Sequence, residues 1–84
     1  MNKLTITYCD RVKVGNRVFF WVNLETETQK RQCCYSRYSG NWHHEDGDRE
    51  PEMSNELRNI FHGKKGNAAL NKCYKYEETV TLEA

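Results

Sequence analysis

The stretch from Arg17 to Leu24, RVFFWVNL, decides the fold of this chain. Its side chains alternate with the two-residue period of a β-strand, and one face carries the even-numbered apolar residues: Val18, Phe20, Val22 and Leu24. Phe19 and Trp21 fall on the opposite face, which makes the strand apolar on both sides. Such a strand is either central in its sheet or meets a partner molecule with its outer face.

Two more strands flank this stretch in the sequence. Residues 3–14 alternate in the same way, although Asp10 breaks the apolar pattern and marks a place for a β-bulge. After a polar connection, a third strand is predicted from Gln29 or Lys30 to Tyr38. Because the connections are short, the simplest topology for the three strands is an antiparallel meander.

The turn between the first two strands leaves their register open. A Gly-Asn turn at residues 15 and 16 pairs Val12 with Phe19. A three-residue loop instead pairs Val12 with Phe20. A slip of one residue would move every apolar side chain to the other face of the strand. We therefore expect the three-residue loop, because it keeps all even-numbered positions on one face.

The second half of the chain contains one clear helix signal. Residues 39–50 are polar and irregular, and Pro51 then fits the first position of a helix that extends to His62. Apolar side chains recur along it at helical spacing: Met53, Leu57, Ile60 and Phe61. After a connection with room for a turn of helix at residues 67–70, alternation over Lys72–Leu82 predicts the last strand.

These elements predict an α+β fold, a small antiparallel sheet of about four strands in the order β-β-β-α-β, with one amphipathic helix packed on one face. The 84 residues and 10.0 kDa suit a single small domain, residues 1–84. No apolar run approaches the ~20 residues of a membrane span, so no membrane partner is expected. With 13 basic and 12 acidic residues the formal net charge is +1, which argues against a basic tail or a highly charged mimic.

The four cysteines, Cys9, Cys33, Cys34 and Cys73, are expected to be reduced. The first ten residues alternate instead of forming an export signal, and the adjacent Cys33 and Cys34 point to opposite faces of a strand. Free thiols of this kind behave as small apolar side chains in a cytoplasmic protein. No pair of cysteines or histidines has the usual spacing of a zinc site, so no metal or other cofactor is expected.

An enzyme is not expected, because no nucleophile motif frames any serine. The nearest feature is the run His43-His44-Glu45-Asp46, whose imidazoles and carboxylates suit a small metal-dependent hydrolase or nuclease. A chain this short has little scaffold left to hold an active site in place. This function is therefore the weakest of the three that the sequence suggests.

Nucleic-acid binding is the stronger alternative. Residues 1–42 hold seven basic and three acidic residues, a net charge of +4, whereas residues 43–53 hold one basic and five acidic residues, a net charge of −4. The predicted third strand interleaves cations with rings that can stack on bases: Lys30, Arg31, Tyr35, Arg37 and Tyr38. The balanced total charge weakens this alternative, because dedicated nucleic-acid binders are usually clearly basic.

The hypothesis that we favour is protein binding. Several aromatic side chains have no place among the even-numbered core positions, and aromatic and Arg residues are the usual composition of interface hot spots. We expect one docking face: Arg17, Phe19, Trp21, Arg31, Tyr35, Arg37, Tyr38 and Trp42. Through it the protein would dock on and modulate a larger protein or protein complex, as an inhibitor or adaptor of the kind that viruses and mobile elements encode. Three alternatives stay open: a homodimer through the same face, a homodimer through an unpaired strand edge, and a second small core in which Phe19 and Trp21 lie under the loop 39–50 or the helix 51–62.

Overall fold

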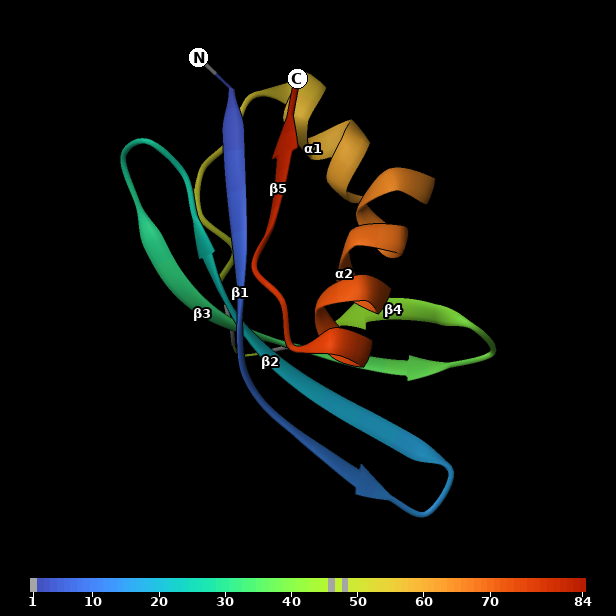
Figure 1. Cartoon of the computed structure of the whole chain (residues 1–84). Helices are drawn as coiled ribbons and strands as arrows, with labels where there is room; N and C mark the ends of the chain where they lie inside the picture. Colours follow the sequence, from blue (N-terminus) through green and yellow to red (C-terminus); the bar gives the residue numbers. More distant parts are fainter. Residues whose placement is uncertain (1, 46, 48) are drawn as a thin grey trace.

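The computed structural model describes residues 2–45, 47 and 49–84, and of Tyr38 only the backbone. A five-stranded antiparallel sheet has the strand order β4-β3-β2-β1-β5. The strands are β1 (Lys3–Val14), β2 (Arg17–Glu25), β3 (Lys30–Tyr38), β4 (Asn41–His44) and β5 (Val80–Glu83). Two helices, α1 (Asn55–Phe61) and α2 (Lys64–Tyr76), lie together on one face of the curled sheet (Figure 1).

The α+β class and the antiparallel sheet are confirmed, but the expectation of about four strands and one helix is wrong. Strand β4 lies inside the stretch 39–50, which its polar composition predicts to be irregular. Helix α2 extends through Tyr76, so the alternation over Lys72–Leu82 is misleading, and β5 begins only at Val80. The buried residues of α2 follow helical spacing instead: Gly66, Ala69, Leu70 and Cys73.

Helix α1 begins later than the expected start at Pro51. Its N-cap is Ser54, whose Oγ accepts a hydrogen bond from the backbone N–H of Leu57 at 3.2 Å. Pro51 lies before the helix and is buried. Leu57 and Phe61, one turn apart, are both buried and belong to the core between α1 and the sheet. The apolar spacing therefore identifies the buried face of α1 correctly, whereas the proline does not identify its start.

A β-bulge at Cys9 decides which side chains of β1 face the helices. Tyr8 pairs with Val22 and Asp10 pairs with Trp21, so Cys9 is the extra residue on β1. The bulge reverses the alternation along the strand. Before it the even-numbered side chains lie on the helix side of the sheet, and after it the odd-numbered side chains do. The break in the pattern that Asp10 indicates is present, one residue earlier.

The hairpin turn between β1 and β2 contains two residues. Val14 pairs with Arg17 and Val12 pairs with Phe19, so the expected three-residue loop is wrong. That expectation assumed one unbroken alternation along β1, which the bulge removes. Gly15 occupies the turn with a φ of 61°, a conformation that glycine adopts at little cost.

The core lies between the sheet and the two helices, with Phe20 at its centre. The ring centroids of Tyr8, Trp42 and Tyr74 lie 5.8, 5.3 and 5.3 Å from that of Phe20. The strands contribute further buried side chains: Leu4, Ile6, Val22, Leu24, Cys33 and Tyr35. The helices complete the core with Leu57, Phe61, Ala69, Leu70 and Cys73. All of these lie on one side of the sheet, and both helices of the described part of the chain cover that same side.

Gly66 allows α2 to pack directly against the end of α1. A Cβ atom at this position would lie 1.7 Å from the carbonyl oxygen of Phe61 and 2.5 Å from its Cα. Both are backbone atoms, which no rotamer change can move out of the way. The corner between the helices therefore requires glycine, and this corner keeps both helices on the same face of the sheet.

Candidate functional site

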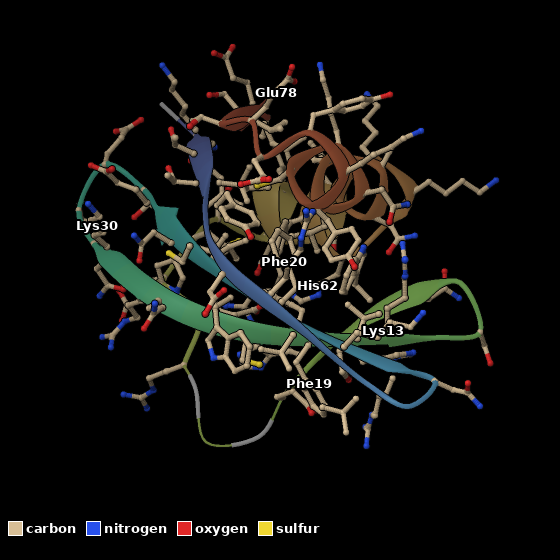
Figure 2. All side chains as sticks on the ribbon, turned by 60° about the horizontal axis from the view of Figure 1, so that its bottom comes forward. Lys13, Phe19, Phe20, Lys30, His62 and Glu78 are labelled. Atoms are coloured by element: carbon tan, nitrogen blue, oxygen red, sulfur yellow. The ribbon has the colours of Figure 1, made fainter. Side chains whose placement is uncertain are left out.

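The face of the sheet that is turned away from both helices, called the outer face below, carries an apolar patch. The patch consists of Val12, Val14, Phe19 and Trp21. Val12 is 43% and Val14 is 60% exposed, and the two aromatic side chains are half-buried. In Figure 2, Phe19 lies on the side of the sheet opposite to the helices, whereas Phe20 points toward them.

The patch is continuous across two strands because of the bulge in β1. Val12 lies directly opposite Phe19, and directly opposite residues of an antiparallel pair point to the same face. Without the extra residue, the valines at the end of β1 would face the helices and its basic residues would take their place. On β2, the ring centroids of Phe19 and Trp21 lie 6.5 Å apart.

Charged groups of both signs border the patch. The guanidinium carbon of Arg17 lies 5.4 Å from the ring centroid of Phe19, and its Nη2 lies 4.0 Å from a carboxylate oxygen of Glu45. At the other end of the patch, the carboxylate of Asp10 accepts a hydrogen bond from the backbone N–H of Arg11 at 2.8 Å. An apolar centre with a polar rim is the usual anatomy of a protein interface.

Two small side chains of β3 lie opposite the aromatic rings of the patch. Trp21 pairs with Cys34, and Phe19 pairs with Ser36. Cys34 is 7% and Ser36 is 0% exposed, although both point to the outer face. Within the described part of the chain, the buried Oγ of Ser36 has no hydrogen-bond partner. A buried hydroxyl that is left unsatisfied destabilises the folded state.

Replacing this hydroxyl is expected to be harmless. We expect a Ser36→Ala variant to keep its free energy of unfolding or to gain up to about 1 kcal/mol, because the change removes only the unsatisfied group. Urea titration of both proteins measures the difference. As a matched control, Ser54→Ala removes the N-cap of α1 and should lower the free energy of unfolding by about 1 kcal/mol. A loss at Ser36 as large as that at Ser54 would contradict the prediction.

The structure divides the eight predicted interface residues between the two faces of the sheet. Three lie on the outer face: Arg17, Phe19 and Trp21. Four lie on the helix side: Arg31, Tyr35, Arg37 and Trp42. Arg31 is assigned to that side because it lies opposite the buried Leu24, and the side chain of Tyr38 is outside the described residues. Sequence reasoning missed Val12 and Val14, because unbroken alternation would place them in the core.

On the helix side, arginine side chains stack on aromatic rings and form hydrogen bonds with a neighbouring amide. We call this group the Arg–aromatic cluster; it consists of Arg11, Arg37, Trp42, Asn71 and Tyr74. The guanidinium carbon of Arg37 lies 4.8 Å from the ring centroid of Trp42 and 5.2 Å from that of Tyr74. Asn71 Oδ1 accepts hydrogen bonds from Arg37 Nη1 at 3.1 Å and from Trp42 Nε1 at 2.7 Å. Arg11 also stacks on Tyr74 and donates to its carbonyl oxygen. The cluster joins three strands to α2, so it is part of the fold.

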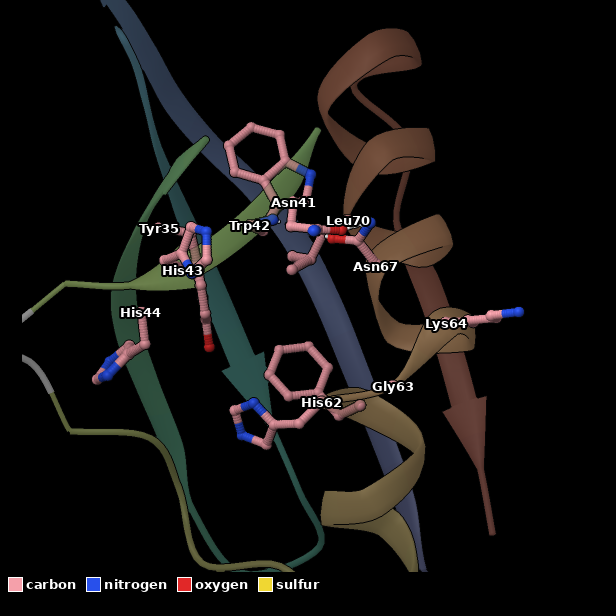
Figure 3. A pocket seen from close by; sticks show the side chains of 11 residues that line it. Tyr35, Asn41, Trp42, His43, His44, His62, Gly63, Lys64, Asn67 and Leu70 are labelled. Atoms are coloured by element: carbon pink, nitrogen blue, oxygen red, sulfur yellow. Dashed lines mark hydrogen bonds between the residues drawn. The ribbon is translucent and has the colours of Figure 1, made fainter. Parts of the chain in front are cut away.

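A cavity of about 460 Å³ lies between β4, the end of α1 and the start of α2 (Figure 3). Tyr35, His62 and Lys64 are among the residues that line it. The hydroxyl of Tyr35 donates to one carboxylate oxygen of Glu50 at 2.5 Å, and the other oxygen lies 2.9 Å from His62 Nε2. This row of side chains joins β3, the segment before α1 and the residue after it, which gives it a structural role in closing the fold.

The adjacent histidines of β4 do not form one site. His43 lies opposite Ser36 on the outer face, whereas the ring of His44 lies on the helix side, 5.3 Å from that of Tyr35 between centroids. Because neighbours in a strand point to opposite faces, these two imidazoles cannot bind the same ion. Among the residues that the structure describes, no group of three or more His, Cys, Asp or Glu side chains could hold a metal. The geometry thus offers no support for a metal-dependent hydrolase or nuclease that uses His43 and His44.

The four cysteines of the chain are free thiols. Cys73 lies on the buried face of α2. Burial, and to a smaller extent the nearby Cys9, raise the pKa of the Cys73 thiol from 9.0 to about 11. The folded protein therefore keeps this thiol protonated at pH values at which the unfolded chain would ionise it.

Stability is consequently expected to fall between about pH 9 and pH 11. Over that range the unfolded state gains free energy by releasing the proton of Cys73, and the folded state does not. The contribution is roughly 2 kcal/mol by pH 11. Because other groups also titrate there, the test is a difference: the free energy of unfolding of a Cys73→Ala variant should depend less on pH than that of the wild type. Equal slopes for the two proteins would contradict this assignment.

No protein-family model, curated protein or solved structure matches this chain. Among the described helices, none has the length and apolar character to cross a membrane. The functional argument therefore rests on geometry. Among the described residues, Val12 and Val14 of the patch are two of the three large apolar side chains that are exposed.

Proposed function

We propose that this protein is a non-catalytic binding protein that docks on a larger protein through the apolar patch. The observation that carries the proposal is the pairing of the exposed Val12 with Phe19 on a sheet face that neither α1 nor α2 covers. Contiguous apolar surface is unfavourable in water, and on small domains it marks sites of interaction.

The composition of the patch supports a protein as the partner. Phe19 and Trp21 supply large contact area at a low loss of side-chain freedom, and Arg17 beside them can bond to carbonyl or carboxylate groups. The β-branched valines are stiff, and a hydrogen-bonded sheet holds all four side chains in place. Little conformational entropy is lost when a partner covers such a surface. We assign the role of inhibitor or adaptor, in which the docking itself modulates the partner.

Nucleic-acid binding is the competing proposal, and one observation favours it. Helix α2 carries no acidic residue and four exposed lysines: Lys64, Lys65, Lys72 and Lys75. The third-strand residues Tyr35 and Arg37 are turned toward the helices and engaged there. A nucleic acid would therefore meet α2, on the side of the sheet opposite to the patch.

A photo-reactive amino acid distinguishes the two proposals. It is placed at Val14 in one variant and at the exposed Ala68 of α2 in a second, and both are irradiated in the cells that make the protein. We expect a covalent adduct with one larger protein at position 14, and its loss when Trp21→Ala is added. An adduct with nucleic acid, or with a protein at position 68 alone, would overturn the proposal.

A further inference from the structure

The outer half of β1 has an unpaired edge. β5 pairs with β1 only from Lys3 to Ile6, whereas β2 pairs with the other side of β1 from Thr5 to Val14. Within the described residues, no strand lies beside Asp10–Val14 on the β5 side. Each of these five residues is exposed, and the hairpin projects beyond the helices (Figure 1). An open row of backbone N–H and C=O groups is a template for another strand.

The side chains along this edge differ between the two faces of the sheet. Val12 and Val14 lie on the outer face, as part of the apolar patch. Arg11 and Lys13 lie on the helix side, since they are opposite the buried Phe20 and Val18. The edge thus presents valines on one face and cations on the other.

The two basic side chains of the edge, Arg11 and Lys13, differ in their contacts within the chain. Arg11 Nη2 lies 3.5 Å from a carboxylate oxygen of Glu77, and its Nη1 donates to the carbonyl oxygen of Tyr74. In the part of the chain that the structure describes, Lys13 forms no ion pair. Lys13 is therefore the position where an acidic residue of another strand would find an unused positive charge.

We propose that the edge of β1 at residues 10–14 accepts an extended segment of the partner protein as a sixth strand, in which apolar and acidic residues alternate. The apolar residues of that segment extend the patch beside Val12 and Val14, and its carboxylates lie across from Arg11 and Lys13. The backbone bonds supply affinity, and the alternation supplies specificity. This inference rests on the proposed function and names the chemistry of the partner.

The same charges argue against a second copy of this chain on the edge. In an antiparallel pairing of two such edges that keeps the valines on one face, Arg11 and Lys13 lie beside the cations of the other copy. Like charges directly opposite one another in a sheet are destabilising. The backbone N–H of Arg11 is bonded to the Asp10 carboxylate within the chain, so any added strand, from a partner or from a second copy, finds one N–H group fewer to bond. The cations therefore both prevent self-association and select an acidic partner.

A synthetic probe tests the inference without knowledge of the natural partner. The probe is a blocked seven-residue peptide of alternating glutamate and valine, and its twin carries lysine in place of glutamate. Each is titrated into the isotope-labelled protein, with amide chemical shifts and amide hydrogen exchange as readouts. We expect the acidic peptide to slow exchange along residues 10–14 and the basic twin to bind far more weakly. Lys13→Glu should weaken the acidic peptide about five-fold, whereas Lys65→Glu on α2, with the same change of net charge, should not.

The other outcomes are decisive as well. If the acidic peptide perturbs Phe19 and Trp21 but leaves exchange along residues 10–14 unchanged, strand addition is overturned and the proposed docking on the patch survives. If neither peptide binds, or both bind equally, the charge-selected edge is overturned. If exchange at these amides slows with protein concentration alone, the occupant is a second copy and the inference is wrong.

Discussion

A Gly66→Ala variant is expected to lose most or all of its folded structure. In an ordinary helix interior, alanine in place of glycine stabilises by about 0.5–1 kcal/mol. Here the new methyl group would lie 1.7 Å from the Phe61 carbonyl oxygen, so α2 must move away from the end of α1. We expect a loss of at least ~3 kcal/mol, a large part of the ~4–12 kcal/mol that a domain of this size has. Urea titration followed by circular dichroism measures it.

Two controls separate the collision from helix propensity. Ala68→Gly, two residues further along α2 and exposed, should cost only about 1 kcal/mol. Lys65→Ala, beside Gly66 and exposed, should be close to neutral. If Gly66→Ala instead stabilised the protein, as propensity alone predicts, the close packing of α2 on α1 would be wrong.

Trp21→Ala is expected to weaken binding of the cross-linked partner by about 30- to 1,000-fold, the range of a central aromatic hot spot. The ring is half-buried on the outer face and takes no part in the core around Phe20. The same variant should therefore lose less than about 2 kcal/mol of unfolding free energy. Isothermal titration calorimetry measures the affinity for the partner, and urea titration measures the free energy of unfolding.

The matched control for this variant is Tyr76→Ala. Tyr76 is 58% exposed at the end of α2, so its removal deletes an exposed ring away from the patch. It should leave affinity for the partner unchanged. An effect of equal size at Trp21 and Tyr76 would indicate a general loss of apolar surface, and not docking on the patch.

The strand that carries the patch could be predicted from the sequence, because its period of two extends over eight residues without a break. In the structure the even-numbered residues of Arg17–Leu24 are buried, and Phe19 and Trp21 lie half-buried on the opposite face, as that period implies. The end of the chain could not be predicted in the same way. Tyr74 and Tyr76 alternate with Lys75 and Glu77, which is the pattern of a strand with one polar face. The helical spacing of Ala69, Leu70 and Cys73 includes small residues, whose apolar signal is weak.

The prediction of the hairpin register was wrong for a different reason. Alternation along β1 is equally consistent with either turn unless the bulge at Cys9 is known, and a bulge has no reliable residue signature. Its effect on the candidate site is large, since it transfers Val12 and Val14 from the core to the patch. A local irregularity of the backbone, rather than composition, therefore determines the extent of this surface.

The excess of aromatic residues predicted an exposed aromatic face, and the fold accounts for several of these rings itself. Tyr35 is 2% exposed, and Trp42 and Tyr74 are held by Arg37 and the buried Phe20. Arg37 stacks on the rings of Trp42 and Tyr74 and at the same time donates a hydrogen bond to Asn71. These contacts allow the two rings to pack within the fold, although they are not part of an aliphatic core. Of the four predicted rings whose side chains the structure describes (Phe19, Trp21, Tyr35 and Trp42), the first two lie on the outer face.

The most direct test of the central claim compares the two tryptophans in one spectrum. Each indole N–H gives its own signal in a proton–nitrogen correlation spectrum of the labelled protein, and the two rings lie on opposite faces of the sheet. When the cross-linked partner is added, we expect the Trp21 signal to shift or broaden, and that of Trp42, whose Nε1 is bonded to Asn71, to stay in place. A moving Trp42 signal beside an unchanged Trp21 would show that the partner binds the helix side, and would contradict docking on the apolar patch.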